Sequence, residues 1–126
     1  MVIDTSAIAA ILFKEPGFEA LIERIEESET LLISAASLVE LSIVVESRKG
    51  EDGARDLDLW LYRARVEIAP VDADQADIAR LAWRRFGKGR HPAGLNYGDC
   101  FAYALAKKTG LPLLYKGNDF SLADLA

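Results

Sequence analysis

The sequence contains very little cysteine and histidine, with only Cys100 and His91 in 126 residues. A single cysteine cannot form a disulfide within the chain, so we expect a fold held by its core in a reducing, cytoplasmic environment. A cysteine hydrolase would have to pair Cys100 with His91. Because Cys100 lies in an apolar helical stretch, it is more typical of a small core residue.

Long apolar runs and targeting signals are also missing. Charged residues interrupt every apolar run well before the roughly 18 residues of a membrane span. The amino terminus lacks a basic segment followed by an apolar one, so we expect neither a signal peptide nor a membrane partner. With 51% hydrophobic residues and no internal repeat, the sequence predicts one domain over residues 1–126 with a core of its own.

Positive charge is scarce overall but locally concentrated. The chain has 15 Lys and Arg against 20 Asp and Glu, for a net charge of −5, which disfavours a protein that coats nucleic acid. Residues 84–91 nevertheless contain four cations and no acid. They are either a solvated helix end, where cations are favoured, or a patch that contacts phosphate. The cations concerned are Arg84, Arg85, Lys88 and Arg90.

Short apolar runs alternate with amphipathic segments, which is typical of α/β proteins with a parallel sheet. Gly50 and Gly110 are expected to end helices, and Ser34 or Ser37 to begin one. The expected strands cover 1–4, 31–34, 66–71 and 113–115, and the expected helices cover 6–13, 16–27, 34–48, 55–65, 72–87, 96–108 and 118–126.

Four acids attract attention because they lie next to apolar segments: Asp4, Glu40, Asp99 and Asp119. Each has a structural explanation. Asp4 is a candidate helix cap, Ser37-x-x-Glu40 fits a capping box, and Asp99 lies in a first helical turn where negative charge is favoured. Asn118 and Asp119 are candidate caps of the last helix.

Their placement indicates a shared site. Asp4 and Asp119 follow the carboxyl ends of expected parallel strands, where open α/β sheets bind ligands. Glu40 and Asp99 lie early in helices near the same edge. Carboxylates gathered this closely repel one another unless a cation neutralises them, and Mg²⁺ or Mn²⁺ suits oxygen ligands. The polar residues expected to orient water or phosphate there are Thr5, Ser6, Asn96 and Asn118.

Four segments together resemble a known family over essentially the whole chain. They look like the motifs of PIN-domain ribonucleases and, more narrowly, of VapC-type toxins of bacterial toxin–antitoxin pairs. The segments are Val2-Ile3-Asp4-Thr5-Ser6-Ala7, Ser37-Leu38-Val39-Glu40, Asn96-Tyr97-Gly98-Asp99-Cys100-Phe101-Ala102-Tyr103-Ala104 and Leu114-Tyr115-Lys116-Gly117-Asn118-Asp119-Phe120.

The resemblance implies a three-layer α/β/α fold around a short central parallel sheet. It also implies hydrolysis of RNA phosphodiesters with Mg²⁺, for which Mn²⁺ can substitute. Asp4, Glu40 and Asp99 would be the core catalytic and metal-binding carboxylates, and Asp119 the fourth, although many relatives carry an acid where this chain has Asn118. The family's sheet usually has one more strand after the last helix, which here would be short or absent.

The same resemblance implies partners. Such toxins are held inactive by a VapB-type antitoxin and tend to form homodimers, or heterotetramers and larger assemblies with the antitoxin. The basic residues Arg84, Arg85, Lys88 and Arg90 would then hold the RNA backbone. Trp60, Tyr62 and Trp83 are candidate partner contacts or core residues. The alternative function is a catalytically silent PIN-like module that binds RNA or protein.

Overall fold

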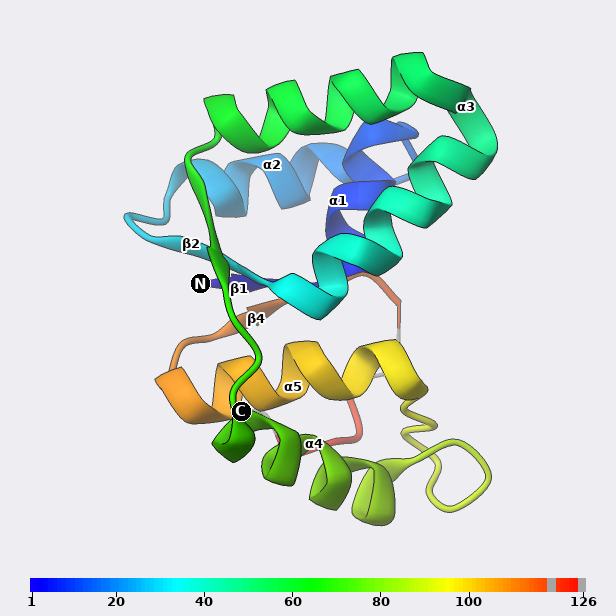
Figure 1. The fold of residues 1–126 in the computed structure, drawn as a ribbon, viewed down its shortest axis with the longest axis vertical. Coiled ribbons are helices and arrows are strands. Elements are labelled where there is room, and N and C mark those ends of the chain that lie inside the picture. Colours follow the sequence, from blue (N-terminus) through cyan, green and yellow to red (C-terminus); the bar gives the residue numbers. More distant parts are fainter. Residues whose placement is uncertain (118–119, 125–126) are drawn as a thin grey trace.

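The computed structural model describes residues 1–117 and 120–124 and has a parallel sheet between two layers of helices (Figure 1). The four strands pair in the order β3-β2-β1-β4. This arrangement confirms the predicted α/β/α architecture. The elements are β1 (Val2–Ile3), α1 (Thr5–Leu12), α2 (Phe18–Glu26), β2 (Leu31–Ser34), α3 (Ala35–Arg63), β3 (Val66–Ala69), α4 (Ala73–Phe86), α5 (Tyr97–Thr109) and β4 (Leu113–Leu114).

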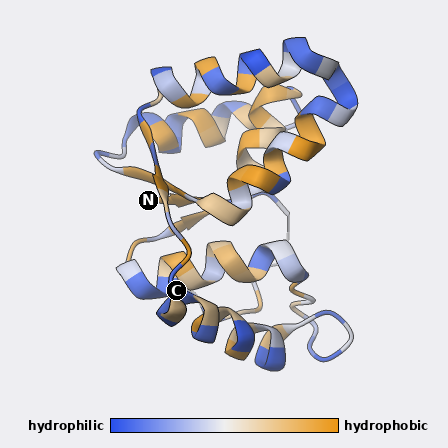
Figure 2. Ribbon diagram, viewed as in Figure 1, coloured by the Kyte–Doolittle hydropathy of each residue, from blue (hydrophilic) through white to orange (hydrophobic). Residues whose placement is uncertain are grey.

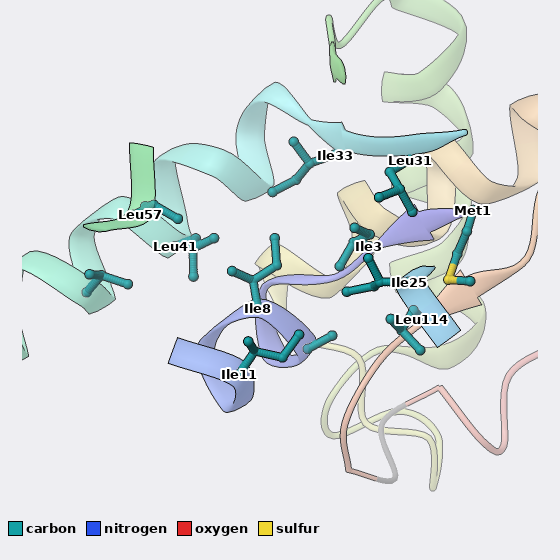
Figure 3. Close-up of a cluster of buried hydrophobic side chains, with 12 residues drawn as sticks. Met1, Ile3, Ile8, Ile11, Ile25, Leu31, Ile33, Leu41, Leu57 and Leu114 are labelled. Atoms are coloured by element: carbon teal, nitrogen blue, oxygen red, sulfur yellow. The ribbon is translucent and has the colours of Figure 1, made fainter. Parts of the chain in front are cut away.

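Helices α1, α2 and α3 lie above the sheet in Figure 1, and α4 and α5 lie below it. The main core fills the space between the sheet and the upper helices, where Ile3, Ile8 and Ile33 are fully buried (Figure 3). A second cluster joins α4 and α5 around Leu95 and Phe86. Hydrophobic residues therefore concentrate on the strands and the inner faces of the helices (Figure 2), as burial of apolar surface requires.

Strand β1 lies in the middle of the sheet and determines where a ligand site can form. Val2 pairs with Leu32 of β2 on one side and with Leu113 of β4 on the other. The chain builds outward from β1 through β2 to β3 and then returns to add β4 on the opposite side. The strand order thus reverses between β1 and β4, and open α/β sheets bind ligands at such a point.

Helix α3 is two helical segments joined at Gly50, whose backbone (φ 64°, ψ −157°) is not helical. The predicted helix end at Gly50 is therefore confirmed as a sharp kink. The second segment begins before Arg55, its predicted first residue. Glu51 and Asp52 supply negative charge there, which the start of a helix favours.

Two predictions are wrong. Residues 120–124 form a turn rather than part of a terminal helix, because their side chains are held by tertiary contacts. Phe120 is buried against the ring of Tyr115 at 5.1 Å, and the Asp124 carboxylate accepts a hydrogen bond from the Tyr103 hydroxyl at 2.5 Å. The capping box at Ser37 does not form, since Ser34 caps α3 by accepting from the Ala36 N–H.

Within the described residues, no strand follows β4, and no helix has both the length and the apolar character needed to span a membrane.

Candidate metal centre

Asp4 lies directly after β1 and begins α1. Its backbone N–H donates to the Leu114 carbonyl at 2.9 Å, so the residue is fixed between β1 and β4. The side chain is only 3% exposed, and its Oδ2 accepts from both the Ser6 N–H at 3.0 Å and the Ser6 hydroxyl at 2.6 Å. The predicted helix cap is therefore confirmed, and it holds a nearly inaccessible carboxylate in one orientation.

The pKa of Asp4 lies above its ordinary value. Burial is the main cause, because it penalises the charged form, and the negative charge of Glu40 raises the pKa further. Hydrogen bonds from Ser6 and Thr5 lower the pKa, but by less than burial and Glu40 raise it. Among the residues that the structure describes, no cation contributes to the pKa of Asp4, so nothing positive stabilises the ionised carboxylate there.

Two hydroxyl groups connect Asp4 to the adjacent elements. The Ser6 hydroxyl accepts a hydrogen bond from the Lys116 N–H at 3.0 Å while donating to Asp4. The Thr5 hydroxyl donates to the Ser37 carbonyl at 3.2 Å, which joins the start of α1 to the first turn of α3. Thr5 and Ser6 therefore hold the start of α1 and the Asp4 carboxylate in place. Their predicted role, to orient water or phosphate, stays a prediction.

Glu40 reaches the site from the second turn of α3. It is half-buried, and its carboxylate packs against the backbone of Gly98 in the first turn of α5. A Cβ placed on Gly98 would lie 2.0 Å from Glu40 Oε2. The influence of Glu40 on the pKa of Asp4 shows that its charge also acts on that carboxylate. The start of α1, the second turn of α3 and the first turn of α5 therefore approach one another around Glu40.

Asp99 lies beside that contact and forms a capping box with Asn96. Its Oδ2 accepts from the Asn96 N–H at 3.0 Å, and the Asn96 Oδ1 accepts from the Asp99 N–H at 2.9 Å. The carboxylate is buried, at 8% exposure. Asn96 therefore positions Asp99, which confirms the predicted first-turn location of this acid.

The residues present fit a divalent cation with oxygen ligands. Asp4 and Asp99 are buried, the charge of Glu40 acts on Asp4, and the buried Ser37 hydroxyl of α3 has no hydrogen-bond partner among the described residues. Within residues 1–117 and 120–124, no three acidic, histidine or cysteine side chains enclose a cation by themselves. Mg²⁺ usually keeps several waters and takes only one or two carboxylates from protein, so it does not require an enclosing cluster of this kind.

Two predicted site residues, Asn118 and Asp119, lie outside the described residues. The chain leads toward them from the carboxyl end of β4, through Lys116. The Lys116 side chain forms an ion pair with Glu15 at 3.1 Å, while its backbone N–H contacts Ser6 as described above. The fourth ligand therefore stays a prediction.

The basic segment spans the end of α4 and the loop that leads into α5 (Figure 1). This loop is closed at its base, where the Lys88 N–H donates to the Leu95 carbonyl at 2.8 Å. Lys88 and Arg90 are exposed, and the Arg90 guanidinium lies 4.5 Å from the Trp83 ring centroid. Arg85 differs, because its guanidinium pairs with Asp124 at 3.4 Å.

The cysteine–histidine alternative does not form. The Cys100 thiol donates to the Asn96 carbonyl at 3.3 Å, and burial, with a contribution from the charge of Asp99, raises its pKa to about 11. A thiol with this pKa is protonated near neutral pH and is a poor nucleophile. His91 Nδ1 accepts the Ala93 N–H at 3.0 Å, and the described residues show no hydrogen bond between His91 and Cys100.

Sequence reasoning gave no role to Lys116 or Gly98, and gave Ser37 only that of a helix cap. Nothing in the sequence marks the Lys116 N–H, because its contact with Ser6 spans 110 residues. Gly98 carried a weak signal, since glycine in the first turn of an otherwise good helix often marks a close approach.

Comparison with known proteins identifies relatives along the full chain. The PIN domain family model matches residues 1–125. A ribonuclease VapC of Mycolicibacterium smegmatis is 61% identical over 126 residues, covering 100% of this chain and 98% of that protein.

Two solved structures share the fold at low sequence identity. Mycobacterium tuberculosis VapC20, a sarcin–ricin loop cleaving toxin, has a TM-score of 0.77 at 21% identity, covering 99% of this chain and 95% of that one. VapBC2 of Rickettsia felis, bound to a DNA fragment from its promoter, has a TM-score of 0.74 at 19% identity, covering 95% and 89%.

The buried charge of Asp4 leads to a stability prediction. Because burial raises its pKa in the folded protein, the ionised carboxylate lowers the free energy of unfolding above that pKa. In EDTA at pH 7, we expect Asp4→Asn to raise Tm by on the order of a few degrees. The gain should disappear as the pH falls below about 3.9, the ordinary pKa of aspartate.

Thermal unfolding of Asp4→Asn, with the exposed-site variant Asp58→Asn as control, measures this effect. Adding Mn²⁺ should make the Tm of wild type higher than that of Asp4→Asn, because the cation stabilises only the wild-type carboxylate. An Asp4→Asn protein that is less stable than wild type in EDTA would show that the Ser6 hydrogen bonds outweigh the burial penalty.

Proposed function

This chain belongs to the PIN-domain family and is a VapC ribonuclease, the toxin of a toxin–antitoxin pair, and we propose that its activity depends on Mg²⁺ held by Asp4, Glu40 and Asp99. The observation that supports this proposal is the approach of α1, α3 and α5 at the carboxyl edge of the sheet. Asp4 is buried there with a pKa raised in part by the charge of Glu40, and the Glu40 carboxylate packs against Gly98, the residue before Asp99.

When bound, the cation supplies the chemistry for RNA hydrolysis by lowering the pKa of a coordinated water and stabilising charge on the leaving oxygen. The protein's part is to hold its carboxylates in place. Ser6 orients Asp4, and Asn96 orients Asp99, through the hydrogen bonds described above. Asp119, with Asn118 beside it, is proposed as the fourth acidic position.

The basic segment is proposed to hold the RNA backbone. An acidic protein repels a polyanion, so local cations are needed to bring phosphate to the carboxylates. Arg84, Lys88 and Arg90 are exposed and close in sequence to the start of α5, which carries Asp99. Arg85 would have to break its ion pair with Asp124 to bind phosphate, so we assign it a smaller contribution to RNA binding.

The antitoxin is proposed to bind a groove above the sheet, between α2 and the second segment of α3. The cavity there has a volume of about 610 Å³. Its lining is mainly apolar, and Leu59 is 46% exposed. Its charged lining residues are Glu26, Asp56 and Arg63, so acids outnumber cations and would favour a segment with both apolar and basic residues. The apolar lining residues include Leu12, Ile22, Ile25, Leu31, Leu59 and Trp60.

A homodimer is proposed from the apolar side chains exposed beside the carboxylates. Val39 and Ile43, on α3, are 59% and 62% exposed and flank Glu40 in sequence, and Tyr97, on α5, is 80% exposed. A second copy that covered them would remove this apolar surface from water. Heterotetramers and larger assemblies with the antitoxin would follow from such a dimer.

The silent-module alternative is disfavoured by the ribonuclease relative and by the presence of Asp4, Glu40 and Asp99 together.

Cleavage of RNA by the purified protein tests the metal-dependent function. We expect Mg²⁺-dependent cleavage that EDTA abolishes. Glu40→Gln and Asp99→Asn should each lower the rate at least about 100-fold, because even residues that only support metal ligands contribute 10–100-fold.

The matched controls are Glu46→Gln on the same helix and Asp58→Asn, both at exposed positions. Cleavage that persists in EDTA, or variants at Glu40 and Asp99 that retain the wild-type rate, would contradict the proposal.

Charge reversal tests the basic segment. In an Asp99→Asn background that does not cleave, Lys88→Glu with Arg90→Glu should weaken binding of single-stranded RNA about equally for all sequences. The slope of log affinity against log salt should fall by roughly 1–2, since two phosphate contacts are lost. Fluorescence anisotropy measures both quantities, with Arg24→Glu on α2 as control. An unchanged salt slope would contradict a role for this loop.

Substitution in the groove tests the antitoxin site. Leu59→Glu should weaken binding of the cognate antitoxin at least about tenfold, because it places a charge in an apolar contact, while RNA cleavage stays unchanged. Leu81→Glu on α4, at 51% exposure, is the matched control below the sheet. Calorimetry measures the affinity, and light scattering gives the mass of the assembly. Equal effects of the two variants would place the antitoxin elsewhere.

A further inference from the structure

Gly98 provides a space that no other residue type would leave. It is the second residue of α5 and is buried. A Cβ at this position would lie 2.0 Å from Glu40 Oε2 and 2.6 Å from both Glu40 Cδ and Oε1. Real Cβ atoms do not come this close to another heavy atom, so the Glu40 carboxylate occupies the volume of the missing side chain.

Other glycines with close neighbours meet different kinds of atoms. A Cβ on Gly53 would meet Lys49 Cβ at 2.5 Å, and one on Gly87 would meet the Trp83 carbonyl at 2.3 Å. Those contacts lie within or beside the glycine's own helix and concern packing alone. At Gly98 the three nearest atoms all belong to the carboxylate of Glu40, which comes from a different helix.

The location of this contact connects the two helices of the metal centre. The first turn of α5 presents the positive end of the helix dipole, which favours a carboxylate. Asp99 lies next to Gly98, and the charge of Glu40 also acts on Asp4. How closely the Glu40 carboxylate approaches α5 therefore determines its position relative to Asp4 and Asp99.

We propose that Gly98 is a positioning residue, whose missing side chain lets the Glu40 carboxylate reach its place between Asp4 and α5. This inference rests on the proposed metal centre and specifies what holds its second ligand. Glu40 is a flexible side chain, so an added methyl group would displace the carboxylate without unfolding the protein. Alanine also favours helix over glycine, so Gly98→Ala should not lower the stability of the metal-free protein.

Gly98→Ala should weaken Mn²⁺ binding at least about tenfold in calorimetry, as loss of a residue that orients a ligand does. Its Tm in EDTA should equal or exceed that of wild type. Thr109→Ala, at the opposite end of α5, is the matched control, because it alters the same helix without contacting Glu40.

Shortening Glu40 provides the decisive second variant. Glu40→Asp alone should weaken Mn²⁺ binding, because the carboxylate then stops short of α5. Combined with Gly98→Ala, it should bind Mn²⁺ more tightly than Gly98→Ala alone, since the shorter side chain no longer collides with the methyl group. This non-additivity is the signature of direct coupling between the two residues.

The outcomes separate the two proposals. If Asp4→Asn abolishes Mn²⁺ binding while Gly98→Ala leaves it unchanged, the metal centre stands and the role of Gly98 is overturned. Additive effects of Gly98→Ala and Glu40→Asp on Mn²⁺ affinity would also overturn the role of Gly98, whether or not Gly98→Ala lowers Tm. A wild-type protein that binds no Mn²⁺ would overturn both.

Discussion

The buried charge of Asp4 is the constraint on which the site depends. A carboxylate at 3% exposure is costly to ionise, and the nearby charge of Glu40 adds to that cost. The fold offsets part of it with two hydrogen bonds from Ser6. In the proposed site a divalent cation would offset the remainder, so the arrangement that makes Asp4 costly to ionise would also favour binding of the metal.

Helix α5 assembles the other half of the site within a single turn. Asn96 caps the helix and orients Asp99, and Gly98 admits the carboxylate of Glu40 from α3. Residues within one turn thus cap the helix, orient Asp99 and make room for Glu40. The link between Ser6 and the Lys116 N–H joins this assembly to the end of β4, which leads toward the predicted fourth acid.

Much of the fold could be predicted from local patterns. The apolar runs before Asp4 and Ser34 identified two strands, and Gly50 identified the break in α3. Errors arose where tertiary contacts outweigh local preference. The Ser37 box fitted its motif, yet α3 begins one turn earlier at Ser34. Residues 120–124 were expected to be helical, but the contact between Asp124 and Tyr103 holds them in a turn.

For the site, the sequence by itself determined which acids are present and which of them follow strands or begin helices. That was sufficient to predict Asp4, Glu40 and Asp99 as a group, because parallel strands end at a common edge. Only the tertiary structure decided how closely they approach. The Lys116 contact with Ser6 and the space at Gly98 join residues separated by 110 and 58 positions, and no local pattern encodes a contact over such a separation.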